Sequence, residues 1–209
     1  MGTLSWNRSW YLDLNQISRH TAWAHGMAGV YAVLLGLALL AALLILGWLL
    51  ARNQSPRHVA AAISAGGATV LAYVLNQPLE QLVGEPRPYR TLHHVLVLVP
   101  KEHSFAFPSD HAVIAGAVIV GIWIYNWKLG LPTAVLGLAL AFDRVYVGAH
   151  YPADVMAGLI FGGVISALVY LAVRTPLTAF LDLLARTPLR LLVLSRARSG
   201  AASGIEPQP

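Results

Sequence analysis

The feature that most constrains the fold of this chain is a set of long stretches without Asp, Glu, Lys or Arg. Residues 20–51 form the longest one, and its apolar part, from about Met27 to Leu50, is long enough to cross about 30 Å of hydrocarbon as a helix. The other stretches are 58–79, 112–127, 129–142 and 155–173. Because backbone polar groups in lipid must be bonded within their own segment, all five are predicted to be transmembrane helices.

The composition also favours a membrane protein. Only 11% of the residues are charged and 57% are hydrophobic, whereas a soluble domain carries about 25% charged residues. Disorder is excluded as well, because disordered chains combine low hydrophobicity with high net charge. The expected fold class is therefore all-α, a single polytopic transmembrane helix bundle of five to six spans.

The N-terminal part differs from the spans. Residues 1–24 mix polar residues with the aromatic side chains of Trp6, Trp10, Tyr11 and Trp23. This mixture is typical of a helix that lies in the membrane interface with aromatic anchors. The transmembrane domain is expected to cover residues 25–175.

The C-terminal part is apolar but interrupted by charges. Residues 177–194 carry Asp182, Arg186 and Arg190, each of which costs about 2.5–3.5 kcal/mol at the bilayer centre. We therefore predict that 176–209 is an amphipathic surface helix followed by a disordered tail from Ser199. A sixth span is the alternative.

The distribution of Lys and Arg orients the bundle. With five spans, eight of these residues lie on the face that holds 51–57, Lys128 and the segment from Arg174 onward, against six on the other face. An excess of Lys and Arg marks the cytoplasmic side of a cell membrane, so the second face is expected outside or in the periplasm. The Lys and Arg residues of the cytoplasmic loops account for the net charge of +5. Because the membrane explains this charge, nucleic acid is not an expected partner.

Titratable residues gather on this second face. Six of the nine acidic residues lie between 80 and 154, and five of the eight histidines join them. Four helix ends meet there, so these side chains form one layer at the membrane boundary, where ionisable groups are costly unless they are functional or paired. A solvated loop face is the alternative interpretation from composition alone.

Three short segments of this layer carry a pattern. They are Glu80 with Arg87-Pro88, then Pro108-Ser109-Asp110-His111, and then Arg144 with His150 and Asp154. Together they resemble the signature of the type 2 phosphatidic acid phosphatase family. That signature is Lys, six residues, Arg-Pro; then Pro-Ser-Gly-His; then Ser-Arg, five residues, His, three residues, Asp. The resemblance covers about residues 56–173 and implies a transmembrane lipid phosphatase whose catalytic domain is the bundle.

Three positions depart from the family pattern, and each makes the site more acidic. Glu80 replaces Lys, Asp110 replaces Gly and Asp143 replaces Ser. The Pro-Ser-Asp-His form resembles the subgroup that dephosphorylates undecaprenyl diphosphate. This favours a polyprenyl diphosphate as substrate and carrier-lipid recycling as the role, with phosphatidic acid or phosphatidylglycerophosphate as the alternative substrate. Asp110 and Asp143 either pair with arginines or point to water.

The replacement at Glu80 removes one phosphate contact of the family. Either Arg90 or Lys101 supplies that contact instead, or Glu80 fixes Arg87 by an ion pair. The sequence leaves these possibilities open.

The resemblance assigns catalytic roles that the chemistry of the residues supports. A neutral imidazole nitrogen of His150 attacks phosphorus to form a phosphohistidine, and Asp154 accepts a hydrogen bond from the other ring nitrogen. Pro152 is expected at the first position of the last span, which puts His150 just before this helix and Asp154 in its first turn. His111 is the general acid that protonates the leaving oxygen and later deprotonates the attacking water.

The remaining predicted site residues bind the substrate. Arg87 and Arg144 are expected to clamp phosphoryl oxygens, because guanidinium offers paired donors that match phosphate. Ser109 is expected to be the N-cap of the helix that carries His111, where free N–H groups favour an anion. The predicted substrate-binding set also includes Pro88, Glu80, Asp110 and Asp143.

Other features are less specific. His93, His94 and His103 could bind a metal or a second phosphate, although wet interfacial histidines are commoner. No closed metal-ligand spacing appears, so neither a metal nor another cofactor is expected. Gly158 and Gly162 form a small-xxx-small pair that predicts close helix packing. The bilayer and a membrane lipid are the expected partners, the oligomeric state is open, and a non-catalytic lipid transporter or binding protein is the alternative of another class.

Overall fold

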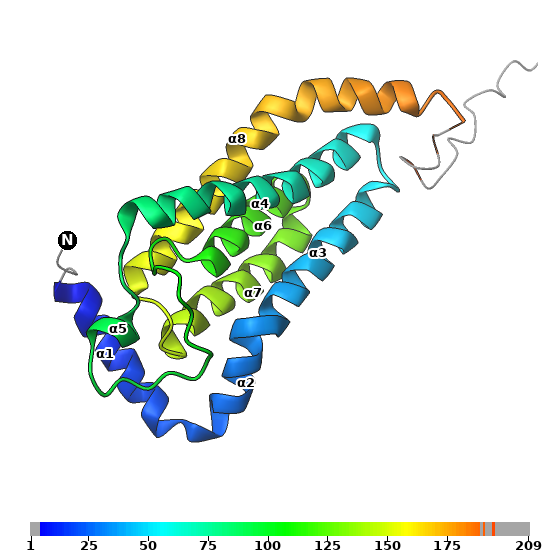
Figure 1. Ribbon diagram of the computed structural model, residues 1–209. Coiled ribbons are helices and arrows are strands. Elements are labelled where there is room, and N and C mark those ends of the chain that lie inside the picture. Colours follow the sequence, from blue (N-terminus) through cyan, green and yellow to red (C-terminus); the bar gives the residue numbers. More distant parts are fainter. Residues whose placement is uncertain (1–4, 189, 191–193, 195–209) are drawn as a thin grey trace, which may run out of the picture.

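The computed structural model describes residues 5–188, 190 and 194, and all regular structure in this part of the chain is helical (Figure 1). The elements in chain order are α1 (Ser5–His20), η1 (Ala22–Ala24), α2 (His25–Val30), η2 (Tyr31–Leu35), α3 (Gly36–Ala51), α4 (Pro56–Val83), α5 (Pro88–Thr91), α6 (Asp110–Tyr125), α7 (Trp127–Tyr146) and α8 (Pro152–Leu184).

Four helical stretches among the described residues are long and apolar enough to cross a membrane. They are Ala22–Ala51, Pro56–Thr91, Trp127–Tyr146 and Pro152–Leu184. The helix α6 is apolar as well but has only 16 residues. These four stretches and α6 correspond to the five predicted spans, and the predicted all-α membrane bundle is confirmed.

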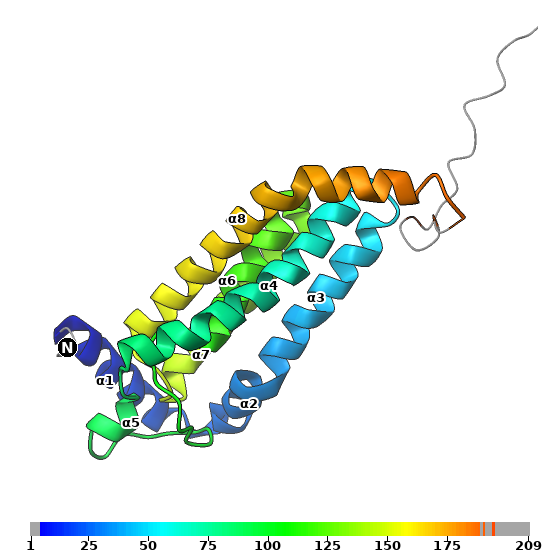
Figure 2. The ribbon, with the colours of Figure 1, turned by 45° about the horizontal axis from the view of Figure 1, so that its top comes forward.

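The short helix α6 lies among its neighbours in the bundle and packs against α4, α7 and α8 (Figures 1 and 2). Glycines let α6 and α8 approach closely. A Cβ atom on Gly162 would lie 1.9 Å from the carbonyl oxygen of Val113, and one on Gly116 would lie 2.1 Å from that of Leu159. The close packing predicted at Gly158 and Gly162 is therefore found, and it fixes α6 against α8.

Helix boundaries follow local sequence signals. Pro56, Pro88 and Pro152 stand at the starts of α4, α5 and α8, where the missing N–H costs nothing. The prediction for Pro152 is confirmed. At the other end of α4, Gly84 adopts a left-handed φ of 64°, which ends the helix.

The helix α8 is longer than the sequence predicts. It continues from Pro152 through Pro176 to Leu184, so residues 176–184 are its last turns rather than a separate helix. No sixth span lies within residues 5–188. Figures 1 and 2 show that α8 bends where its yellow part turns orange, which is the usual response to an internal proline. The tail predicted to be disordered lies outside the described residues.

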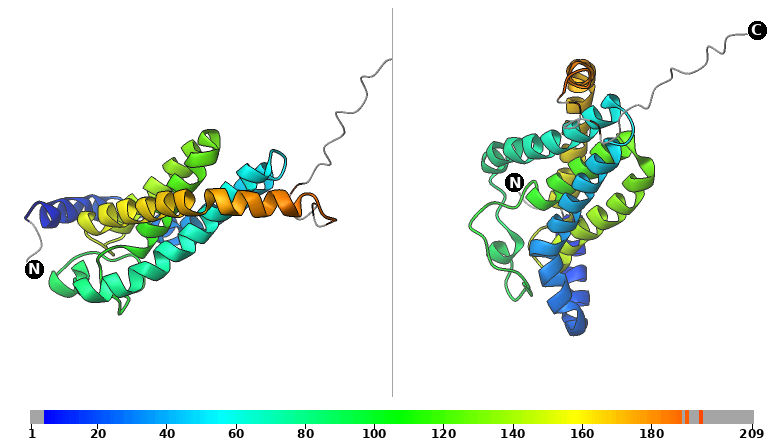
Figure 3. Two further views of the ribbon diagram at one scale, coloured as in Figure 1. Left: turned by 90° about the horizontal axis from the view of Figure 1, so that it is seen from above. Right: turned by 90° about the vertical axis from the view of Figure 1, so that its right-hand side faces the viewer.

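The helix α1 lies at the same end of the molecule as the first turns of α8, while the last turns of α8 lie beside the α3–α4 turn at the opposite end (Figure 3). The buried stripe of α1 is polar and consists of Asn7, Tyr11, Asn15 and Ser18. Its exposed residues include Trp6, Trp10 and Ile17. A helix therefore occupies most of the segment predicted to lie in the membrane interface, with its polar stripe facing the protein and its large apolar side chains facing outward.

Candidate active site

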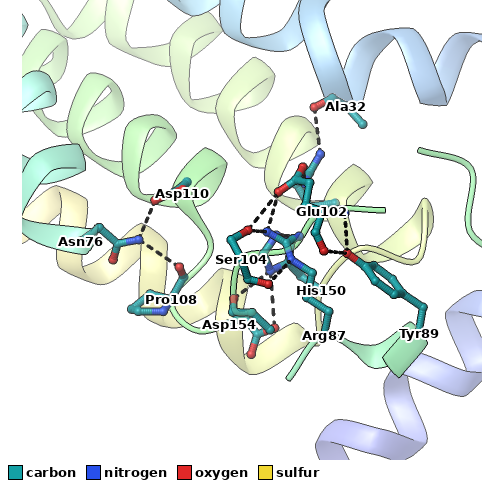
Figure 4. Close-up of polar contacts among 12 residues, drawn as sticks. Ala32, Asn76, Arg87, Tyr89, Glu102, Ser104, Pro108, Asp110, His150 and Asp154 are labelled. Carbon is teal, nitrogen blue, oxygen red and sulfur yellow. Dashed lines mark hydrogen bonds and ion pairs between the residues drawn. The ribbon is translucent and has the colours of Figure 1, made fainter. Parts of the chain in front are cut away.

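The three predicted motif segments meet at one end of the bundle. Arg87 follows α4, and His111 lies in the first turn of α6. Arg144 lies in the last turn of α7, and His150 lies in the turn between α7 and α8. The irregular segment 92–109 supplies further contacts to this cluster (Figure 4). The helix ends therefore bring together residues that are up to 67 positions apart in the sequence, from Arg87 to Asp154.

The imidazole of His150 is buried and held by two contacts. Its Nδ1 lies 2.8 Å from the carbonyl oxygen of Ala106, and its Nε2 lies 3.1 Å from Nη1 of Arg87. Because a carbonyl oxygen can only accept, Nδ1 carries the proton and Nε2 keeps its lone pair. The ring is thus fixed in a tautomer in which Nε2 can act as a nucleophile.

The surroundings also keep this ring neutral. Burial, followed by the positive charges of Arg144 and Arg87, lowers the pKa of His150 well below its usual value of 6.5. A lowered pKa means that the ring stays unprotonated at neutral pH. This is the state that nucleophilic attack requires.

The predicted hydrogen bond between Asp154 and His150 is replaced by a longer contact. Oδ2 of Asp154 lies 3.5 Å from Nδ1 of His150, which is beyond the usual hydrogen-bond range, and it accepts the backbone N–H of Tyr151 at 2.8 Å. The first turn of α8 has free N–H groups, and the carboxylate caps it. Asp154 therefore fixes the turn next to His150, while Ala106 takes the closer position at the ring.

Both predicted phosphate ligands are buried cations. Nη2 of Arg87 donates to Oε2 of Glu102 at 2.6 Å and to Oγ of Ser104 at 2.7 Å. Nη1 of Arg144 donates to the carbonyl oxygen of Ala32 at 3.2 Å. Nε of Arg144 has no hydrogen-bond partner among the described residues, and Nη2 makes no hydrogen bond there but lies 3.6 Å from Oε1 of Glu102. Buried donors without a partner are rare, and here they suit an anion.

Ser109 is the N-cap of α6, as predicted. Its backbone N–H donates to the carbonyl oxygen of Asp154 at 3.1 Å, which joins α6 to α8. Its Oγ is buried, makes no capping bond and has no partner in the described part of the chain. His111 lies in the first turn of α6, within range of the charges of Arg87 and Arg144. The predicted general acid and the unused hydroxyl thus belong to the same cluster as His150.

The possible ion pair between Glu80 and Arg87 does not form. It is buried in α4, and its carboxylate faces the backbone N–H of Phe105. The ion-pair partner of Arg87 is Glu102. The loop that follows α5, and not α4, therefore supplies the carboxylate that pairs with Arg87.

The two cations proposed to replace the family lysine are engaged elsewhere. Nη2 of Arg90 donates to the backbone carbonyl of Glu102 at 2.8 Å. The ammonium of Lys101 lies 5.8 Å from the centre of the Tyr89 ring. Both contacts hold the segment around Glu102, so neither side chain is directed at Arg144 or His150.

Asp110 pairs with amides rather than with arginines. Its Oδ1 accepts from Nδ2 of Asn76 at 2.7 Å and from Nε2 of Gln77 at 2.9 Å. The same Asn76 nitrogen donates to the carbonyl oxygen of Pro108 at 3.0 Å (Figure 4). The carboxylate at this position, where the family has Gly, thus ties α4 to the start of α6 and fixes the turn that carries Ser109.

Asp143 lies outside the cluster around His150. It is buried on α7, and its Oδ2 has no hydrogen-bond partner among the described residues. It lines an apolar groove together with Met27, Tyr31 and Phe142. The predicted pairing with an arginine is not found in the described structure.

His93, His94 and His103 are exposed on the 92–109 segment. No group of three or more His, Cys, Asp or Glu side chains among the described residues could hold a metal ion. Pro88 is buried at the start of α5 and positions Arg87 before it.

Sequence reasoning missed two groups of residues. The first is Glu102, Ser104 and Ala106, which contact Arg87 and His150 although no motif marks them. The second is the polar stripe of α1, described next.

The stripe of α1 binds the backbone on both sides of His150. Oδ1 of Asn7 accepts the N–H of Ala153 at 2.9 Å, and the hydroxyl of Tyr11 donates to the carbonyl oxygen of Gly148 at 3.2 Å. Gly148 has a φ of 81°, so the chain turns sharply at that point. The helix α1 therefore holds the turn that carries His150.

Asn15 extends this contact to the neighbouring segment. Its side chain donates to the carbonyl oxygen of Leu96 at 2.8 Å and accepts the N–H of the same residue at 3.0 Å. Asn7 and Asn15 lie in a segment that contains many other polar residues, so their residue type does not mark them as buried. Their spacing of eight residues, which puts them on one face of a helix, was the only sequence signal for this contact.

A family model described as the PAP2 superfamily matches residues 61–177. The chain belongs to the PAP2 superfamily. The undecaprenyl-diphosphatase BcrC of Bacillus subtilis (strain 168) is 34% identical over 146 residues, which are 70% of this chain and 73% of that protein. An undecaprenyl-diphosphatase of Sulfolobus acidocaldarius is 35% identical over 103 residues, 47% of this chain and 48% of that protein.

The fold of this PAP2 protein is also similar to a crystal structure. That structure is a transmembrane PAP2-type phosphatidylglycerolphosphate phosphatase from Bacillus subtilis. The superposition has a TM-score of 0.59 at 18% sequence identity, and it covers 79% of this chain and 85% of that chain. These findings confirm the predicted family, the helical membrane fold and the predicted enzyme class, a type 2 phosphatidic acid phosphatase-like phosphatase. The helix α1 lies outside the region that the family model matches.

Proposed function

We propose that this PAP2 protein hydrolyses a polyprenyl diphosphate, undecaprenyl diphosphate first of all, to the monophosphate and inorganic phosphate in the recycling of a carrier lipid. The observation that carries the proposal is the setting of His150. Its Nδ1 donates to a carbonyl, and its Nε2 lies 3.1 Å from the guanidinium of Arg87. The two undecaprenyl-diphosphatase relatives support this lipid over phosphatidic acid.

In the first half-reaction, the lone pair of Nε2 attacks the terminal phosphorus. An N–P bond forms as the bond from phosphorus to the bridging oxygen breaks, and the proton of His111 passes to this leaving oxygen. Arg87 and Arg144 stabilise the charge on the phosphoryl oxygens, which is the main catalytic task in phosphoryl transfer. The negative substrate also favours the protonated form of His111.

In the second half-reaction, water attacks the phosphorus of the phosphohistidine. The N–P bond breaks, its electron pair returns to Nε2, and the proton of the water passes to His111. Phosphate leaves, and both histidines regain their starting states. The carbonyl of Ala106 holds His150 in one orientation through both steps.

The test is release of phosphate by the purified full-length protein in detergent. Undecaprenyl diphosphate, phosphatidic acid and phosphatidylglycerophosphate are compared, each with and without chelator. We expect hydrolysis of the diphosphate to be fastest and insensitive to chelator. Faster release from phosphatidic acid or phosphatidylglycerophosphate would make the alternative substrate the correct one. No release from any of the three would favour the lipid transporter or binding protein.

A pair of variants tests the nucleophile. His150→Ala should lower kcat by about 10³-fold or more, because a covalent route loses its attacking atom. His93→Ala removes an exposed histidine at the same end and should keep normal turnover. The wild type quenched during turnover should carry acid-labile phosphate that His150→Ala lacks. Near-normal turnover of His150→Ala would refute the mechanism.

We further propose that the active site faces the outside or the periplasm, since the opposite end carries the excess of Lys and Arg. The chain contains no cysteine, so single cysteines report position without background. In intact cells a membrane-impermeant maleimide should label His93→Cys and should label Gln54→Cys only after lysis. The reverse pattern would invert the orientation.

A further inference from the structure

The carboxylate of Glu102 stands between the two arginines that are proposed to bind phosphate. Oε2 of Glu102 lies 2.6 Å from Nη2 of Arg87, and Oε1 lies 3.6 Å from Nη2 of Arg144. The arginine side chains are 4% and 1% exposed, whereas that of Glu102 is 44% exposed. A half-exposed carboxylate of segment 92–109 therefore reaches two buried cations, one of which, Arg87, is labelled beside it in Figure 4.

The backbone of Glu102 is held independently of its side chain. The hydroxyl of Tyr89 accepts its N–H at 3.0 Å and donates to its carbonyl oxygen at 3.2 Å. Nη2 of Arg90 donates to the same carbonyl at 2.8 Å. Rotation of the side chain alone can therefore move the carboxylate away from Arg87 and Arg144 while the loop stays in place.

Carboxylate and phosphate compete for the same donors. Guanidinium binds both through charge-assisted hydrogen bonds, and a phosphoryl group bound by Arg87 and Arg144 would need the position of the Glu102 carboxylate. The pairing also has a reason to exist in the resting enzyme, because buried cations left without a counter-charge are strongly destabilising.

We propose that Glu102 is a specificity-determining residue of the phosphate subsite: its carboxylate occupies the subsite at rest, is displaced by the terminal phosphate of the lipid, and returns to displace inorganic phosphate. The inference rests on the proposed function, in which Arg87 and Arg144 bind the transferred phosphate. A lipid diphosphate has its tail and second phosphate as additional contacts with which to displace the carboxylate. Free phosphate has neither, so Glu102 discriminates against the product.

Glu102→Gln tests the proposal because it keeps the shape of the side chain and removes its charge. An internal competitor reduces apparent affinity by the fraction of molecules in the open state, so its removal should tighten binding of inorganic phosphate by about tenfold. Binding is measured by calorimetry on the purified full-length protein with inorganic phosphate alone. Phosphate inhibition of lipid hydrolysis should increase by the same factor.

Two further variants complete the test. Asp13→Asn makes the same change of charge on the exposed face of α1 and should leave phosphate affinity within about twofold of the wild type. Glu102→Asp keeps the charge but shortens the reach, and should give an intermediate affinity. Without phosphate Glu102→Gln should unfold at a lower temperature than the wild type, and added phosphate should raise this temperature more than in the wild type.

The direction in which Glu102→Gln changes the affinity for phosphate distinguishes the proposal from a purely structural role of Glu102. If Glu102 only held Arg87 in place, Glu102→Gln would bind phosphate equally well or more weakly, and that result overturns the proposal. If Glu102→Gln does not fold, unchanged or weaker binding by Glu102→Asp overturns it. The phosphate titration needs no turnover. Tighter binding in a protein that hydrolyses no lipid diphosphate would support the role of Glu102 and refute the proposed substrate.

Discussion

Gly162→Ala should separate α6, which carries His111, from α8, which begins two residues after His150. A Cβ atom at Gly162 would lie 1.9 Å from the carbonyl oxygen of Val113, and ordinary contact begins at 3.4 Å. The helices α6 and α8 must therefore move apart by about 1.5 Å, because the obstacle is backbone and cannot rotate away. Val113 lies two residues after His111, so the displacement reaches the proposed general acid directly.

Gly162→Ala is expected to lower both the stability of the protein and its turnover rate. Overpacking of a close interface lowers stability by about 1–3 kcal/mol, which corresponds to a fall of about 2–12 °C in the unfolding midpoint. A misplacement of about 1 Å between reacting groups can lower the rate by about 100-fold, so kcat should fall by between about tenfold and 100-fold. Both are measured in detergent, by thermal unfolding and by phosphate release.

Gly67→Ala is the matched control. It makes the same substitution in the exposed face of α4, where a Cβ atom would meet nothing within 4 Å. Alanine there should leave kcat unchanged and raise stability by up to about 1 kcal/mol, since glycine is a poor helix former. If Gly162→Ala matched Gly67→Ala in both unfolding midpoint and kcat, the close packing of α6 on α8 would not be what positions the histidines.

Three further predictions concern the groups around the site. Asn7→Ala leaves the N–H of Ala153 without its acceptor, and it should lower kcat by about five- to 100-fold, the equivalent of about 1–3 kcal/mol. Asn7→Asp keeps the acceptor and should retain turnover. Equal losses of kcat in the two variants would refute the positioning role of α1. Asp110→Ala should likewise reduce kcat while Asp110→Asn, which can still accept from two amides, should not. For His150, the folded pKa is lowered, so its contribution to stability is intact above about pH 6.5 and is lost as the pH falls toward the folded pKa. The unfolding midpoint of the wild type should therefore fall more steeply between about pH 6.5 and 4.5 than that of His150→Gln, and parallel curves would contradict the buried neutral ring.

The sequence predicted those parts of the site that depend on helix ends. Pro152 at the start of α8 and Ser109 before α6 mark where helices begin, and this is enough to place His150 before α8 and His111 in the first turn of α6. Charge-free stretches likewise predicted the spans, because the cost of charge in lipid is local and large. The continuation of α8 past Pro176 was not predictable on the same basis, since a proline that ends many helices only bends this one.

The contacts that the sequence could not predict are those made by irregular backbone. Ala106 orients His150 through a carbonyl oxygen, which every residue type carries. Glu102 reaches Arg87 because of the path of segment 92–109, and Glu80 was the nearer candidate only along the chain. A period or a helix signal cannot encode such a path, so Glu102 was not predicted as the partner of Arg87.

The polar stripe of α1 has a consequence for the order in which this protein is completed. The ribosome makes α1 before α8, and the backbone groups that Asn7 and Tyr11 bind lie 146 and 137 residues later in the chain. Until translation has passed Ala153, these side chains have no partner and must stay hydrated at the membrane surface. Docking of α1 is therefore a late event of biogenesis, and it coincides with closure of the turn around His150. A nascent chain that has inserted the helices before α8 still lacks an ordered turn around His150.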